Sequence, residues 1–228
     1  MQQRLSKVLA HLGVASRRKA EALILEGVVY VNHNLVTEVA TFVDPEMDHI
    51  SVYGKALGKK ISPKIWGYHK PKGLITTHDD PQGRPTVFDH IDVGERVISV
   101  GRLDLNTEGL LLLTNYGPWA QNLEKSDLNR VYKVRFFGEC RETLLDRIRK
   151  PFSIDGVHYN PFDVIQTQDK WLTITIKEGK NREIRRALEW LNLKVSRLIR
   201  ISYGPFELRD LPVGQIQSLN PNLIFQVF

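Results

Sequence analysis

The chain has 228 residues, of which 42% are hydrophobic and 25% charged, with a net charge of +6, and these are ordinary values for a globular protein. Its one cysteine, Cys140, excludes an intramolecular disulfide and a Cys-rich zinc site, which favours a reducing compartment. The longest leucine run, residues 110–113, is far shorter than the ~20 residues of a membrane helix, and the N-terminus lacks the apolar stretch of a signal peptide. We therefore expect a cytoplasmic protein that makes no use of a membrane.

Two short helices are expected at the start of the chain. Apolar side chains recur at helical spacing over residues 4–12 and 17–26. Gly13 ends the first helix, and Ser16 is a favourable N-cap for the second.

A small sheet and a linker are expected next. Strand-like segments lie at residues 28–31, 35–39 and 50–52. A stretch rich in Gly, Lys and Pro at residues 54–64 is typical of a linker. We therefore expect one domain over residues 1–60 and a second over residues 61–228.

Three consecutive cations, Arg17, Arg18 and Lys19, occupy the first turn of the second expected helix. The positive end of the helix dipole lies there, so the three charges are unfavourable without an anion, and a phosphate would relieve the repulsion. Residues 1–20 and 180–200 each carry a net charge of +5, which indicates a polyanionic partner. A solvated surface cluster is the alternative interpretation.

The segment RLSKVLAHLGVASRRKAEALILEGVVYVN, which begins at Arg4, resembles an S4 RNA-binding domain. The shared features are a Leu-Ala helix, a Gly, a Ser-Arg-Arg sequence and a Gly-x-Val-x-Val-Asn strand. In the hairpin turn, Asn32-His33-Asn34 replaces the usual Asn-Gly, and Asn tolerates the positive φ angle that such turns need. The resemblance implies that the domain binds structured RNA. The implied RNA-binding residues are Arg4, Lys7, Ser16, Arg17, Arg18 and Lys19.

The remainder of the chain is expected to be an α+β domain with a mainly antiparallel sheet, because strands follow one another too often for a regular βαβ alternation. The expected strands are residues 65–69, 73–77, 97–100, 110–114, 132–137 and 172–177. The expected helices are residues 143–150 and 181–191.

A short polar loop, residues 101–109, lies between two apolar strands. Such a loop can hold a catalytic group rigidly. Asp104 has apolar neighbours on both sides and Arg102 two residues away, a setting that favours an ionised and partly desolvated carboxylate. Such a group can act as nucleophile or base. The spacing alone equally allows a turn residue that caps its own loop.

The sequence GRLDLNTEGLLLLTN, which contains Asp104, resembles the catalytic motif of the RsuA/RluB/RluE/RluF family of ribosomal RNA pseudouridine synthases. The preceding YHKPKGLITTHDDPQGRPTVFD matches that family's Lys-Pro-x-Gly and Asp-Pro-x-Gly-Arg-Pro-Thr blocks. Downstream, NRVYKVRFFG and EGKNREIRRALEWLNLKVSRLIRISYGPFELRDLPVG match the remaining blocks in order. The resemblance covers about Arg4 to Gly214, with Tyr116 in Asn-Tyr-Gly departing from the usual Asn-Asp-Gly.

The resemblance implies four catalytic-site residues. Asp104 matches the catalytic aspartate, Arg185 the basic residue that pairs with it, and Tyr132 the aromatic side chain that packs on the target base. Leu198 falls where a related leucine supports the base. Each has a structural alternative: Arg185 pairs with Glu189 at i+4, Tyr132 is an ordinary strand aromatic and Leu198 an ordinary core residue.

The implied reaction breaks the N1–C1′ bond of a flipped-out uridine, rotates the base and rejoins it through C5, with Asp104 attacking the nucleotide or assisting its cleavage. It needs no redox step or external group, so we expect no cofactor and no metal. Phosphate contacts to offset base flipping are expected from a set of cations near the site. The set is Lys70, Lys72, Arg84, Arg102, Lys180, Arg182 and Arg186.

The expected substrate is ribosomal RNA, as a structured stem-loop that is free or part of a subunit or assembly intermediate, and the protein is expected to act as a monomer. The GRPTVFD and VSRLIRISYGPF segments resemble the large-subunit, RluB-like branch more than the small-subunit one. Two alternatives stay open: the same chemistry on 16S rRNA, and a non-catalytic S4-type protein that binds rRNA or assists ribosome assembly.

Overall fold

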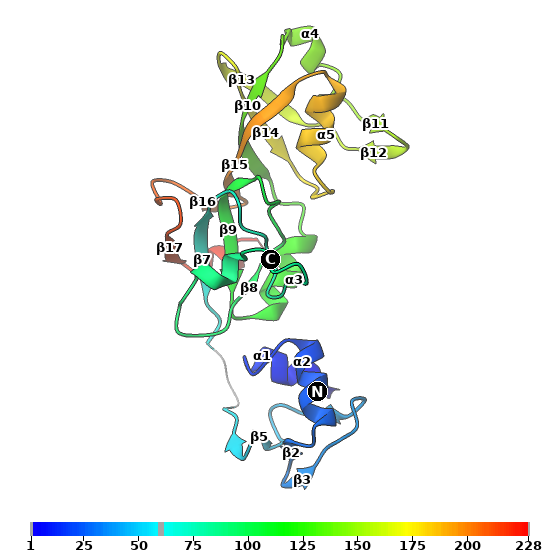
Figure 1. The fold of residues 1–228 in the computed structure, drawn as a ribbon, viewed down its shortest axis with the longest axis vertical. Coiled ribbons are helices and arrows are strands. Elements are labelled where there is room, and N and C mark those ends of the chain that lie inside the picture. Colours follow the sequence, from blue (N-terminus) through cyan, green and yellow to red (C-terminus); the bar gives the residue numbers. More distant parts are fainter. Residues whose placement is uncertain (1, 59–61, 228) are drawn as a thin grey trace. The chain divides into compact units, whose positions relative to one another are not determined.

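The computed structural model describes residues 2–58 and 62–227, which form two compact units (Figure 1). The first unit contains the described residues up to Lys64 together with Val93–Ile98 and Thr114–Pro118. The second contains Ile65–Asp92, Ser99–Leu113 and the described residues from Trp119 onward. The domain boundary expected between residues 60 and 61 lies outside the described residues and stays a prediction.

The N-terminal part consists of two helices and short antiparallel strands. In chain order its elements are β1 (Gln3–Arg4), α1 (Leu5–His11), α2 (Arg17–Leu25), β2 (Val29–Val31), β3 (Asn34–Leu35), β4 (Phe42–Val43), β5 (Ile50–Val52) and β6 (Lys55–Ala56). β1 pairs with β4, and the other strands form a sheet in the order β3-β2-β5-β6. Leu5, Leu9 and Ile24 of the helices and Val29 of β2 are fully buried in its core.

Both expected N-terminal helices are confirmed, with bounds that differ by one residue at each end, except for the start of the second. The Ser16 side chain accepts a hydrogen bond from the Lys19 backbone N–H at 3.3 Å, which confirms it as the N-cap of α2. Asn32 and His33 both have positive φ angles, +50° and +69°, as a tight hairpin turn between β2 and β3 requires.

Two expectations for this part are corrected. The strand expected at residues 35–39 shrinks to β3, which ends at Leu35. The linker expected at residues 54–64 starts later, because β6 pairs with β5 and belongs to the sheet; residues 59–61 of that linker lie outside the described residues.

The rest of the chain is built around one mixed sheet. The strands of this part of the chain are β7 (Ile65–Lys70), β8 (Ile98–Ser99), β9 (Glu108–Thr114), β10 (Arg130–Phe137), β11 (Phe152–Ile154), β12 (Val157–Tyr159), β13 (Asp163–Gln168), β14 (Trp171–Ile176), β15 (Lys194–Tyr203), β16 (Phe206–Glu207) and β17 (Ile216–Leu219). Its helices are the 3-10 turn η1 (Val87–His90), α3 (Gly117–Lys125), α4 (Glu142–Leu145), α5 (Glu183–Trp190) and α6 (Asn222–Phe225).

The main sheet has the order β13-β14-β10-β15-β9-β7-β17, while β11 and β12 form a separate hairpin. β13, β14, β10 and β15 pair antiparallel, and α5 lies beside them (Figure 1). β15 and β9 instead pair in parallel over a short register, Ile199 with Glu108 and Arg200 with Gly109. The expected α+β class with a mainly antiparallel sheet is confirmed.

Two expected elements of this part are wrong. Residues 73–77 form an isolated bridge from Ile75 to Thr86 instead of a strand. The helix expected at residues 143–150 stops at Leu145, because the chain then turns so that the Ile148 carbonyl accepts a hydrogen bond from Phe162 N–H at 2.8 Å. β15 is a strand that the sequence analysis did not identify.

Among the helices of residues 2–58 and 62–227, none combines the length and the hydropathy that crossing a bilayer requires.

Candidate active site

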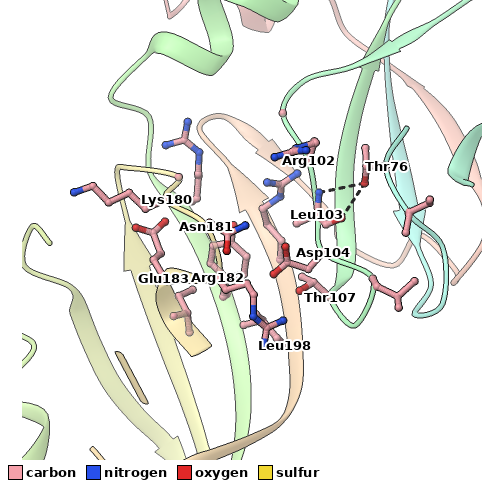
Figure 2. A pocket seen from close by; sticks show the side chains of 18 of the residues that line it. Thr76, Arg102, Leu103, Asp104, Thr107, Lys180, Asn181, Arg182, Glu183 and Leu198 are labelled. Carbon is pink, nitrogen blue, oxygen red and sulfur yellow. Dashed lines mark hydrogen bonds between the residues drawn. The ribbon is translucent and has the colours of Figure 1, made fainter. Parts of the chain in front are cut away.

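A cavity of about 810 Å³ opens in the second unit, beside the polar loop of residues 101–107. Figure 2 shows Asp104 and Thr107 on one side of this cavity and Lys180, Asn181 and Glu183 on the other. Tyr132 from β10 and Leu198 from β15 also line it. Three of the four predicted catalytic-site residues, Asp104, Tyr132 and Leu198, are therefore brought to one cavity from segments far apart in the chain.

The β-strand register explains why Tyr132 and Leu198 share the cavity. Both are at least nine-tenths buried, and they occupy neighbouring antiparallel strands in which Tyr132 is paired with Arg200 and Val134 with Leu198. Alternate residues of a strand point to the same side of the sheet. Tyr132 and Val134 therefore share a side with Leu198 and Arg200.

The loop that carries Asp104 is held by hydrogen bonds along its length. The Gly101 N–H donates to the Glu124 carboxylate at 2.7 Å. The Thr76 hydroxyl donates to the Leu103 carbonyl at 2.9 Å and accepts from the Leu103 N–H at 3.3 Å (Figure 2). Because backbone N–H and C=O groups need hydrogen-bond partners, these contacts hold the chain on the N-terminal side of Asp104.

Lys70, at the end of β7, contacts the loop and is fully buried. Its ammonium group donates to the carbonyls of Pro71, Asp104 and Thr107 at 2.9, 3.1 and 3.0 Å. Burial lowers the pKa of Lys70 to about 8, although the nearby charges of Asp104 and Glu108 act in the opposite direction. The prediction that Lys70 contacts RNA phosphate is therefore wrong, because the side chain is enclosed and its three donors are used within the protein.

The loop ends at the parallel junction of β9 and β15. Gly109 has φ +103°, and an added Cβ atom there would overlap the backbone of Arg200 on the neighbouring strand. Only glycine allows the two backbones to approach so closely. The close approach fixes the position of the loop relative to β15, which carries Leu198.

Glu108, the first residue of β9, is the other acid next to the loop. Its carboxylate accepts hydrogen bonds from the Arg197 guanidinium at 2.9 and 3.1 Å and forms an ion pair with Lys72 at 3.2 Å. Burial raises the pKa of Glu108, but the hydrogen bonds from Arg197 and Lys72 outweigh it and leave the pKa below its ordinary value. Glu108 thus ties β9 to β15 as a carboxylate.

Arg185 reaches the loop from α5, but through the backbone of a residue other than Asp104. Its guanidinium donates to the Asn106 carbonyl at 2.8 Å and more weakly to the Val195 carbonyl at 3.5 Å. In the described part of the chain, no ion pair within 4 Å joins it to Asp104 or to Glu189. Burial and the charge of Arg182 lower the pKa of Arg185, whereas the charge of Asp104 raises it, so the two groups act on each other through space.

Three buried charged residues of the cavity were missed by the sequence analysis. Arg130 donates to the Lys177 carbonyl and to the Tyr203 hydroxyl, the latter at 2.9 Å, and Arg200 donates to the Leu110 carbonyl at 2.7 Å. The third is Glu183, which is 4% exposed. Burial and the charge of Glu178 raise its pKa to about 7, although Lys180 and Arg130 lower it.

Sequence periodicity could have identified two of these residues. Arg130 is two residues before Tyr132 and so belongs to the buried face of β10. Glu183 is four residues before Ala187 and so belongs to the buried stripe of α5. In both cases, the charge of the side chain favours a position on the surface, whereas its spacing along the strand or helix predicts a position in the interior.

The other predicted RNA contacts lie in several settings. Arg84, Arg102, Lys180 and Arg182 line the cavity. Arg84 is paired with Asp80 at 2.7 Å, Lys180 with Glu178 at 2.6 Å, and Arg186 with Asp155 at 3.3 Å. In the N-terminal part, the side chains of Arg4, Lys7, Arg17, Arg18 and Lys19 are exposed.

Comparisons with known proteins agree on the nature of both parts. The family model for RNA pseudouridylate synthase matches residues 64–190, and the S4 domain model matches residues 3–50. The chain is 46% identical to an uncharacterised RNA pseudouridine synthase of Rickettsia felis, covering 97% of this chain and 99% of that protein. It is 38% identical to ribosomal large subunit pseudouridine synthase B of Pasteurella multocida, covering 96% and 67%.

The fold agrees as well. A crystal structure of a pseudouridylate synthase superimposes with a TM-score of 0.71 over 99% of both chains, at 24% sequence identity.

Proposed function

The chain belongs to the RNA pseudouridylate synthase family and carries an S4 domain, and from this premise we propose that its substrate is a uridine of large-subunit ribosomal RNA. Membership confirms the resemblance seen in the sequence and makes the protein a pseudouridine synthase. The Pasteurella multocida relative and a second relative from Haemophilus influenzae, both 38% identical, act on the large ribosomal subunit according to their names, which supports the choice of RNA.

The reaction is an isomerisation in which every atom of the uridine is kept. The N1–C1′ bond breaks, the base rotates, and a C5–C1′ bond forms, while C5 loses a proton and N1 gains one. Asp104 supplies the carboxylate that engages the nucleotide as this bond breaks. A carboxylate held in a partly enclosed site is a stronger nucleophile or base than one in water, because less hydration must be removed.

The observation that carries this proposal is the meeting of Asp104, Tyr132 and Leu198 in one cavity. A uridine stacked in a helix is out of reach, so it must rotate out of the RNA, which costs a few kcal/mol. A cavity of about 810 Å³ is in the range of about 300–1,000 Å³ that ligand sites occupy and admits a flipped nucleotide. The ring of Tyr132 and the side chain of Leu198 offer apolar surface against which the base packs.

Arg185 acts on this chemistry as a positioning residue. Its contact with the Asn106 carbonyl holds the loop two residues beyond Asp104. Cations of the cavity rim, Arg102, Lys180 and Arg182, supply phosphate contacts that offset the cost of flipping. The S4 domain docks on a structured part of the same RNA through its exposed cations.

The test is the release of tritium from large-subunit rRNA labelled with 5-³H-uridine. We expect release by the wild-type protein and a loss of at least about a thousandfold in Asp104→Asn, the scale on which removal of a nucleophile usually acts. Asp169→Asn, a change of an exposed aspartate in the β13–β14 turn, is the matched control and should release tritium like the wild type.

The outcomes separate the alternatives. Equal release by wild type and Asp104→Asn rejects Asp104 as the reacting carboxylate. Release from small-subunit rRNA alone replaces the proposed substrate with 16S rRNA. No release by the wild type, from either RNA in free or subunit-bound form, favours a non-catalytic rRNA-binding protein.

A further inference from the structure

A second cavity, of about 390 Å³, lies along α5 and the turn that follows it. Its walls come from one face of α5 and from the turn that leads into β15, and it contains Arg182, Arg185 and Lys194 with a single acid, Glu189. Arg182 lines this cavity and also the cavity of Asp104. The two cavities are therefore neighbours that share one arginine.

We propose that the second cavity binds the nucleotide next to the target uridine, with its phosphate between Arg182 and Lys194. The inference rests on the proposed function, because it assumes that an RNA strand enters the cavity of Asp104. The volume of the second cavity is in the range of ligand sites, about 300–1,000 Å³, which is enough for one further nucleotide.

The charges of the cavity call for an anion. The guanidinium of Arg182 is near enough to that of Arg185 to lower the pKa of Arg185, so like charges repel there in the free protein. A phosphate between such groups turns this repulsion into attraction. With three cations and one acid, the cavity keeps a net charge of +2.

The position of Arg182 adds to this picture. Arg182 is the N-cap of α5 and has a left-handed backbone conformation, φ +51° and ψ +28°. A cation at a helix N-terminus and a left-handed conformation at a residue other than glycine are both locally unfavourable. Both unfavourable features occur at the residue that lines both cavities, and its side chain is exposed to a backbone phosphate.

The remaining lining suits a base. Val195 offers apolar surface to the ring, while Asn192 and Glu189 bring an amide and a carboxylate to its edge. An amide offers both donor and acceptor, whereas a carboxylate only accepts, so this edge discriminates between bases. The second cavity therefore contributes to the choice of the sequence around the target, which Asp104 and Tyr132 do not read.

The experiment measures the binding of a fluorescent heptauridylate to the full-length protein by anisotropy at several salt concentrations. We expect Lys194→Glu to weaken binding about tenfold. Lys194→Ala should reduce the slope of log K against log salt by about 0.7, the value for one phosphate contact on a single strand. Asn192→Gly, which preserves the left-handed backbone at φ +58°, should leave the salt slope unchanged and reduce discrimination between oligonucleotides of different sequence.

Lys133→Glu is the matched control, because Lys133 is an exposed lysine of β10, next to β15, and is outside the lining of both cavities. Binding like the wild type in Lys194→Glu, or an equal loss in Lys133→Glu, overturns the proposal. Its failure is distinct from failure of the proposed function: tritium release can persist while the Lys194 variants bind normally, and oligonucleotide binding can depend on Lys194 in a protein that releases no tritium.

Discussion

Cations serve opposite purposes at the start of α2 and around the loop of Asp104. Arg17, Arg18 and Lys19 are exposed on the N-terminal unit, at the helix end where positive charge is least favourable. Lys70 and Arg200 of the second unit are buried, and the Lys70 ammonium and the Arg200 Nε donate to backbone carbonyls. The first group is available to a partner, whereas the second group is part of the scaffold.

This difference shows that a basic residue in an RNA-modifying enzyme is not by itself evidence of an RNA contact. A buried cation costs free energy unless its donors are satisfied, so it is retained where several carbonyls must be held together. An exposed cation costs little and contributes little to stability. Substitution of a buried cation should therefore affect stability, and substitution of an exposed cation should affect RNA affinity.

Among the substitutions that test this difference, the largest effect is expected from Lys70→Met, which leaves the carbonyls of Pro71, Asp104 and Thr107 without their donor. Each buried group that loses its partner costs about 1–3 kcal/mol, so the free energy of unfolding should fall by about 2–4 kcal/mol after the gain from removing a buried charge. Tritium release should fall about a hundredfold, because a displacement of about 1 Å at a catalytic group has that effect. Urea denaturation and the release assay measure the two quantities.

Lys133→Met provides the comparison for that variant, since it removes an exposed lysine from β10. It should alter neither stability nor release appreciably. If Lys70→Met keeps full activity, Lys70 does not position the loop. The proposed difference between buried and exposed cations would then be wrong for Lys70.

The next effect concerns pH and Glu183, whose pKa is raised to about 7. The folded protein binds a proton there that the unfolded chain releases near pH 4.5, so this stabilisation is full below pH 4.5 and is lost as the pH rises through 7. The loss amounts to at most about 3 kcal/mol, at 1.36 kcal/mol per pKa unit. Glu183→Gln, which imitates the protonated acid, should be more stable than the wild type at pH 8 and similar at pH 4.5.

Urea denaturation from pH 4.5 to 8 measures this difference, with Glu189→Gln on the exposed face of the same helix as control. The control should keep the pH dependence of the wild type. An unchanged pH dependence in Glu183→Gln would show that Glu183 is ionised in the folded protein at neutral pH.

The smallest effect on the fold is expected from the exposed cations at the start of α2. Arg17→Glu combined with Arg18→Glu should weaken rRNA affinity on the order of tenfold or more, and salt should weaken binding less steeply than in the wild type. The fold should persist and α2 should not be destabilised, because acids are favourable at a helix N-terminus. Filter binding and circular dichroism test the two expectations.

The control for this double variant is Lys55→Glu, a change of an exposed strand lysine elsewhere in the N-terminal unit. Unchanged RNA affinity in the double variant removes the start of α2 from the docking surface. A loss of folding in the double variant contradicts the view that Arg17 and Arg18 do not contribute to the stability of the fold.

Much of the fold could be predicted because local patterns determined it. Helices α1 and α2 follow from apolar spacing, and Ser16 marks the start of α2. The failures occur where tertiary contacts decide. β15 carries Arg197 and Arg200 in its interior, so it does not have the composition of a buried strand, and α4 ends early because the Ile148 carbonyl pairs with Phe162.

The candidate site shows the same division. Motif order pointed to Asp104, Tyr132 and Leu198, and the structure places all three in one cavity, while their catalytic roles stay predictions. The partners of the loop could not be predicted, because Thr76, Glu124 and Lys70 reach it from distant segments. A hydrogen bond to a backbone carbonyl leaves no pattern in the sequence, since every residue offers the same acceptor.

The sequence by itself determined the family, the S4 domain, the α+β class and the residue types of the catalytic motif, because all of these depend on local order along the chain. Tertiary structure decided which charges face a partner and which hold the scaffold. Lys70 and Arg17 are equally basic in the sequence, but one is enclosed by carbonyls and the other lies in water. The physical reason is that the free energy of a charge depends on the dielectric and the donors and acceptors around it, and only the folded chain sets those.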